Sequence, residues 1–164
     1  MSQILLRVLA VVLSGVSPEP LEEKVVPFDK LPAECAAVYD TDIRRFRQAT
    51  TTEVIAIDLD GDEVDELLIF NGQSGSGGED WAVMQKINEK YRKTGEVFGL
   101  LYKSGNGLIV ESPCGWENAQ WNYYELVSGK LVCKLEMKVK YSKPIRKNPV
   151  KITVEMKKNI IKWF

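Results

Sequence analysis

The sequence predicts a mainly β fold of the α+β class, an antiparallel sheet or meander preceded by one N-terminal helix. Residues 131–141 have apolar side chains at every odd position and charged ones at 134, 136, 138 and 140, which is the period of a half-buried strand with one apolar face. From residue 54 onward, short apolar runs are separated by turns rich in Gly, Asn, Asp and Ser. An apolar content of 45% in 164 residues is typical of one soluble domain. We therefore expect a single β-rich domain over residues 31–164.

The first 17 residues resemble a secretory signal peptide. An arginine precedes a short apolar run, Val8–Leu13, and the small residues Ser14, Gly15 and Ser17 follow. The run is too short to span a bilayer. We expect export to the periplasm or secretion; the alternative is a short helix packed on the domain of a cytoplasmic protein. Prolines among charged residues then predict an extended linker over residues 18–30.

A helix is expected from Leu31 to about Gln48, because Pro32 suits a first turn and apolar residues recur at helical spacing. Ser104–Gly107 and Ser128–Gly129 are expected to be hairpin turns, and 71–80 a loop rich in Gly and Ser. The expected strands are Val54–Ile57, Leu67–Phe70, Trp81–Lys86, Gly95–Lys103, Leu108–Glu111, Gln120–Val127, Leu131–Tyr141 and the alternating stretch Val150–Met156.

The most informative stretch is the acidic segment 58–66, which lies between two expected strands. Six of its nine residues are acids. Calcium loops place oxygen ligands at positions one, three, five and nine, with a backbone carbonyl at position seven. Those positions are occupied here by Asp58, Asp60, Asp62, Val64 (carbonyl) and Glu66. We therefore expect a Ca²⁺ site, with a solvated acidic turn as the alternative.

This D-x-D-G-D-x-x-D-E pattern, followed by Leu67–Phe70, resembles the calcium loop of FG-GAP/VCBS-type repeats, which form the blades of integrin-like propellers. The resemblance implies a single-loop secreted bacterial variant without catalytic machinery. Position six of the loop is usually Gly and is Glu63 here. If that position is left-handed, a non-Gly residue costs roughly 1–2 kcal/mol and lowers affinity. Only one such loop is present, so a full propeller is not expected.

The composition excludes several classes of function. The chain contains no histidine, which removes Ser–His–Asp and Cys–His catalysis and imidazole metal sites. A net charge of -1 offers no footprint for nucleic acid. The Gly/Ser segment lacks the pattern of a phosphate-binding loop.

Four aromatic residues and two cysteines are further candidates for sites. Aromatic side chains in a cluster can bind a sugar or a peptide, but more often they form the core of a sheet. Cys114 and Cys133 lie on segments expected to be neighbouring strands, so they are the expected disulfide; three buried free thiols are the alternative. The aromatic candidates for binding a protein or glycan partner are Trp116, Trp121, Tyr123 and Tyr124.

Taken together, these patterns predict a non-enzymatic binding or structural domain that holds Ca²⁺. A small inhibitor or immunity protein that blocks a partner enzyme is the second hypothesis. A metal-dependent hydrolase is the third, since it would need an open coordination position and a second pair of carboxylates.

Overall fold

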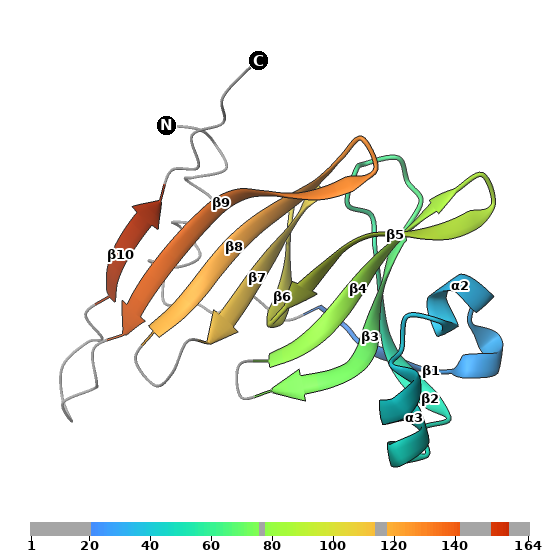
Figure 1. The fold of residues 1–164 in the computed structure, drawn as a ribbon. Coiled ribbons are helices and arrows are strands. Elements are labelled where there is room, and N and C mark those ends of the chain that lie inside the picture. The colour runs from blue at the N-terminus through green and yellow to red at the C-terminus, as the bar shows by residue number, and fades with distance from the viewer. Residues whose placement is uncertain (1–20, 76–77, 114–117, 142–151, 158–164) are drawn as a thin grey trace.

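Two antiparallel five-stranded sheets make up most of the protein, so the predicted mainly β fold is confirmed (Figure 1). The computed structural model describes residues 21–75, 78–113, 118–141 and 152–157. Within these residues the sheets do not close into a barrel or a propeller. The first sheet has the order β1-β2-β3-β4-β5, formed by Lys24–Pro27, Thr51–Ile57, Glu66–Gly75, Gly78–Ile87 and Lys90–Phe98. The second has the order β10-β9-β8-β7-β6, formed by Ile152–Lys157, Lys130–Tyr141, Asn118–Val127, Gly107–Pro113 and Leu100–Ser104.

Within each sheet, strand order follows chain order. Tight turns connect β6 to β7 at Gly105-Asn106 and β8 to β9 at Ser128-Gly129, as the sequence predicts. Ser128, Gly129 and Gly105 all have positive φ, which suits hairpin turns.

The chain passes from the first sheet to the second at Gly99. The expected strand 95–103 is therefore wrong as one element: it is the end of β5 and most of β6. Gly99 has φ +140°, and a Cβ there would lie 2.2 Å from the carbonyl oxygen of Glu111. Only glycine fits this crossing, because both the backbone angle and the lack of space exclude a side chain.

The main core lies between the two sheets. It is formed by buried side chains from both, with Leu59 of the acidic loop among them. Ile55 and Ile57 of β2 share it with Leu108 and Val110 of β7. Burial of large aliphatic side chains contributes about 1.5–3 kcal/mol each, so this layer holds the sheets together.

Two short helices replace the single helix predicted over residues 31–48. They are α2 (Ala33–Ala36) and α3 (Thr41–Arg47). Asp40 separates them because its carboxylate caps α3, accepting the N–H groups of Asp42 and Ile43. From α2, the fully buried Cys35 packs with Val54, Ile69, Ala82 and Met84 on the side of the first sheet away from the main core.

The predicted linker 18–30 is also corrected by the structure. Lys24–Pro27 forms the edge strand β1, paired with β2, and Phe28 is buried in the main core. Val25 and Val26 favour a strand, and Pro27 is tolerated because the strand is at an edge. The predicted signal peptide, residues 1–17, lies outside the described residues.

Most of the predicted Gly/Ser loop 71–80 is strand. β3 continues to Gly75 and β4 begins at Gly78, with residues 76–77 outside the described part. Small residues favour a flexible connection only where the segment does not pair with another strand. Here Ser74 pairs with Glu79, so the ladder between the two strands extends into this stretch.

Strand β9 confirms the predicted strand 131–141 but not its single apolar face. Tyr124 pairs with Cys133 whereas Tyr123 pairs with Leu135, so the register shifts between them. Such a bulge moves the following side chains to the opposite face. Leu131 therefore packs toward the main core, while Leu135 lies on the other face of the second sheet.

Candidate metal-binding loop

The acidic loop connects the end of β2 to the start of β3. Its backbone turns at Gly61 and Glu63, which have φ +83° and +67°. The sixth position of the predicted calcium loop is thus left-handed and occupied by a glutamate. A residue with a Cβ is strained there by about 1 kcal/mol or more relative to glycine.

Aspartate side chains fold this loop locally. Asp58 accepts the N–H of Gly61 at 2.7 Å and that of Glu63 at 3.4 Å. Asp62 accepts the N–H of Val64 at 2.8 Å. These contacts are the local side-chain to backbone bonds that Asp favours in turns. They bring the loop into a compact conformation with its carboxylates close together.

Leu59 fixes the orientation of the loop, because its side chain is buried in the main core between two acidic neighbours. Asp58 and Asp60 therefore point away from that core. Glu66, at the start of β3, turns its carboxylate back under the loop, where one oxygen accepts the N–H of Leu59 at 2.8 Å.

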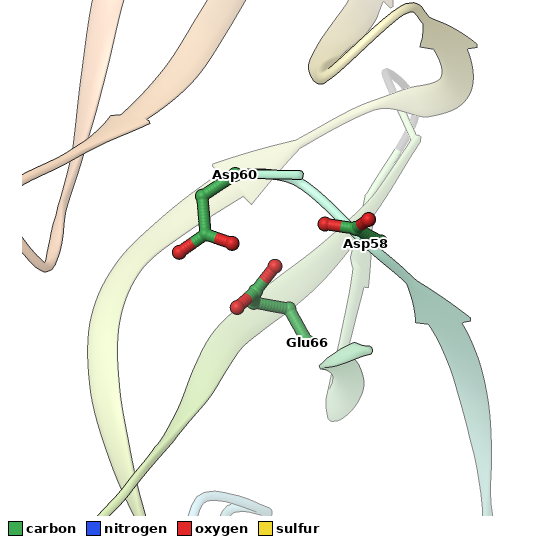
Figure 2. Close-up of side chains that lie close together, drawn as sticks. All are labelled: Asp58, Asp60 and Glu66. Atoms are coloured by element: carbon green, nitrogen blue, oxygen red, sulfur yellow. The ribbon is translucent and has the colours of Figure 1, made fainter. Parts of the chain in front are cut away.

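Three carboxylates converge as a result (Figure 2). Asp58, Asp60 and Glu66 each contribute an oxygen, and these oxygens lie within 4.8 Å of one another. Asp62, the fourth predicted carboxylate ligand, is exposed and does not belong to this group. Val64, which the sequence predicts to offer its backbone carbonyl, is also exposed. The structure thus brings together three of the four predicted carboxylate ligands.

Of the three carboxyl groups, that of Glu66 has the pKa most strongly raised, so it loses its proton least readily. Its side chain is 1% exposed, and burial raises the pKa of its carboxyl to about 7, with the neighbouring aspartates adding to the shift. Burial also raises the pKa of Asp60, to which the charge of Asp62 contributes. The pKa of Asp58 is lowered instead, chiefly by the hydrogen bond from Gly61.

Two further residues, neither of them predicted from the sequence to belong to a site, support the loop. The amide of Gln85 on β4 donates to Asp60 at 2.9 Å. A Cβ on Gly61 would lie 2.5 Å from the side-chain nitrogen of Asn106, in the turn between β6 and β7. Gln85 gives no sequence signal beyond its polar position in a strand, and the sequence predicts Asn106 only as a turn residue. The loop therefore contacts both sheets.

The predicted aromatic surface is not a single exposed platform. Trp121 and Tyr123 are each 6% exposed, and Tyr124 is half-buried against the main core. Adjacent residues of a strand point to opposite faces, so Tyr123 and Tyr124 cannot share one surface. Trp116 lies outside the described residues.

The structure does not contain the predicted disulfide between Cys114 and Cys133. Cys133 is a free thiol whose pKa is raised by burial, and Cys114 lies outside the described residues. Cys35, the remaining cysteine, is buried beneath α2.

No protein-family model matches the chain, and neither a curated protein nor a solved structure is significantly similar to it. The resemblance to FG-GAP/VCBS-type loops therefore remains a prediction from the motif. Of the helices that the structure describes, none has the length and apolar character needed to cross a membrane.

Proposed function

We propose that this protein is a non-enzymatic binding or structural domain whose acidic loop holds a Ca²⁺ ion. The observation that carries the proposal is the convergence of the buried Glu66 with Asp58 and Asp60. Three carboxylates in this arrangement repel one another, and a hard divalent cation would convert the repulsion into attraction.

Calcium suits this group better than magnesium. Ca²⁺ takes six to eight oxygen ligands in flexible geometry, whereas Mg²⁺ demands a near-ideal octahedron. The three converging carboxylates leave further positions for water or for Asp62 and the Val64 carbonyl, if the exposed part of the loop closes around the ion.

The ion would serve structure rather than chemistry. Asp58, Asp60 and Glu66 are the one group of this kind found among the described residues, whereas a metal-dependent hydrolase needs a second set of groups to activate water and bind substrate. The loop instead contacts Gln85 on the first sheet and Asn106 on the second. A bound ion would stabilise the junction of the two sheets, in keeping with the motif's resemblance to FG-GAP/VCBS-type domains.

Thermal unfolding of the full chain, with Ca²⁺ and then with excess chelator, tests the proposal. A ligand that binds only the folded state at 100 times its dissociation constant adds roughly 2.7 kcal/mol. For a chain of this size that corresponds to a rise in Tm of about 5–10 °C. We expect this rise in the wild type, and a smaller one with Mg²⁺ at the same concentration.

Two variants make the test specific. Glu66→Gln should raise the Tm in chelator, because it removes a buried charge, and should abolish the response to Ca²⁺. Asp29→Ala combined with Glu34→Ala removes two exposed acids elsewhere and should leave the response intact. An unchanged wild-type Tm up to millimolar Ca²⁺ would rule the ion out.

A further inference from the structure

The C-terminal end of helix α3 carries an aromatic side chain between two positive charges. Phe46 is 89% exposed, the highest value among the large apolar side chains that the structure describes. Arg45 and Arg47 are exposed as well, and neither forms an ion pair with a described residue. Aromatic residues and arginine are enriched where proteins meet one another. We call Arg45, Phe46 and Arg47 the helix tip.

Contacts with the main core anchor α3 behind this tip. The guanidinium carbon of Arg44 lies 3.8 Å from the centre of the buried Phe28 ring, and Ile43 packs against the main core. The carboxylate of Asp40 caps the first turn of the helix. The helix tip is therefore presented on a fixed backbone, and a pre-organised surface loses less entropy when it binds.

The acidic loop presents a surface of the same kind with the opposite charge. Val64 is 44% exposed and lies between the exposed acids Glu63 and Asp65. Neither acid forms an ion pair within the described part of the chain. We call Glu63, Val64 and Asp65 the loop tip. Like the helix tip, it has one apolar side chain between two charges.

The two tips cannot meet within one molecule. Strand β2 lies between them in the chain, because α3 precedes it and the acidic loop follows it. A strand of seven residues spans about 23 Å. The tips therefore lie at opposite ends of this strand, and the match between them is available only between different copies of the chain.

We propose that the helix tip of one molecule docks on the loop tip of a second copy. In this contact Phe46 packs against Val64, and the flanking guanidinium groups face the carboxylates of Glu63 and Asp65. Arginine and carboxylate groups form strong hydrogen bonds, often two in parallel. The net charge of -1 leaves little overall repulsion between copies. Because the contact uses different surfaces on the two molecules, it adds copies in a row or a ring and not as a twofold dimer.

The small size of the contact makes the association weak and dependent on salt. Three residues from each molecule bury far less than the roughly 1,200–2,000 Å² of a stable interface. Exposed charges are screened as the Debye length falls from about 30 Å at 0.01 M salt to about 3 Å at 1 M. We therefore expect self-association at millimolar protein concentration in low salt, and its loss in high salt.

An anionic lipid surface is the other occupant that a basic, aromatic tip suits. A second copy is favoured because the chain itself supplies a surface that matches the helix tip both in charge and in its apolar centre. A lipid surface would leave the loop tip without a role.

Sedimentation equilibrium of the full chain in excess chelator tests the proposal independently of the calcium site. Arg45→Glu with Arg47→Glu reverses the charge of the helix tip. Glu63→Lys with Asp65→Lys reverses that of the loop tip and leaves the predicted carboxylate ligands in place. Each variant alone should be monomeric, because its two tips carry charge of the same sign. An equimolar mixture of the two should associate as the wild type does, because each tip of one variant then matches the opposite tip of the other.

Two further variants complete the experiment. Glu22→Lys with Glu34→Lys reverses two exposed acids outside both tips, and should associate as the wild type does. Phe46→Ser keeps the charges of the helix tip and should raise the dissociation constant about tenfold, since it removes the apolar centre of the contact. All the substituted side chains are exposed, so every variant should fold.

Two results would overturn the proposal: a wild type that stays monomeric at millimolar concentration in low salt, or a mixture of the two charge-reversed variants that stays monomeric. Cosedimentation of a monomeric wild type with vesicles of phosphatidylserine and phosphatidylcholine, lost in Phe46→Ser, would assign the helix tip to a lipid surface instead.

Discussion

The two sheets differ in how their second faces are closed. Both contribute one face to the main core, and the other face of the first sheet packs against α2 through Cys35. The corresponding face of the second sheet also carries buried side chains, such as Ile109 and Met137, and neither α2 nor α3 makes extensive contacts with that sheet. Consecutive apolar residues occur in both, as in Leu68–Phe70 and Leu108–Val110. Such runs indicate strands whose two faces are both buried, in agreement with the burial of Ile69 and Ile109.

The largest expected effect comes from substituting one buried isoleucine in each sheet, on the face that points away from the main core. Ile69→Ala beneath α2, and Ile109→Ala on the face of β7 that points away from the main core, should each lower the free energy of unfolding by about 2–5 kcal/mol. Both side chains are at most 1% exposed. Urea unfolding of the two variants measures the difference. A cost below about 1 kcal/mol for Ile109→Ala alone would mean that the side chain of Ile109 is accessible to water in solution.

The free energy of unfolding should depend on pH through the carboxyl group of Glu66, which lies beneath the acidic loop. The pKa of Glu66 is about 7 in the folded protein, above its ordinary value of 4.5. The folded state therefore binds the proton more tightly, and stability without Ca²⁺ should fall as the pH rises from about 4.5 to above 7. The fall should reach about 3 kcal/mol, because each tenfold difference in proton affinity between the folded and unfolded states corresponds to about 1.4 kcal/mol.

Urea unfolding in chelator between pH 4.5 and pH 8 measures this dependence. Glu66→Gln should flatten most of it, and saturating Ca²⁺ should do the same because it favours the ionised carboxylate. A dependence that survives Glu66→Gln unchanged would assign the titration to other carboxyl groups.

The two left-handed residues of the acidic loop should respond in opposite directions. Gly61→Ala adds a strained side chain that meets Asn106, and should cost about 1–2 kcal/mol. Glu63→Gly relieves strain at φ +67° and should gain up to about 1 kcal/mol, or tighten Ca²⁺ binding. Thermal unfolding and calorimetric titration with Ca²⁺ measure the two effects. Equal losses for both variants would show that Glu63 is not strained.

The smallest expected effect tests whether α3 covers the first sheet through the side chain of Phe46. Phe46 on α3 is 89% exposed, although α3 lies beside the first sheet. Phe46→Ser should therefore change the free energy of unfolding by less than about 0.5 kcal/mol. A loss above about 1 kcal/mol would show that α3 closes over the sheet through this residue in solution.

Much of this architecture follows from local sequence patterns. The alternation of β9, the hairpin turns and the acidic loop depend on neighbouring residues, so they are predictable. Asp40 before Thr41 is likewise a readable capping signal, which explains why the predicted helix divides into two. The opposite orientations of Tyr123 and Tyr124 also follow directly from the period of a strand.

Other features depend on contacts that are distant in the sequence. The bulge opposite Tyr123 arises from the pairing of two strands, and the crossing at Gly99 depends on the carbonyl of Glu111. The convergence of three carboxylates, rather than five ligands, depends on the burial of Leu59 and Glu66 in a core built by both sheets. None of these can be read from spacing alone.

The order of strands within the sheets has a consequence for how quickly the protein folds. Every pair of adjacent strands is also adjacent along the chain, and in the part of the chain that the structure describes only the β1–β2 pair has helices between its members. Most of these pairings therefore close short loops, and the entropy lost in closing them is small. Folding rates rise as contacting residues become closer in sequence, so each meander is expected to form rapidly for an all-β topology. The slower event should be the association of the two meanders through the main core, which requires contacts between distant parts of the chain.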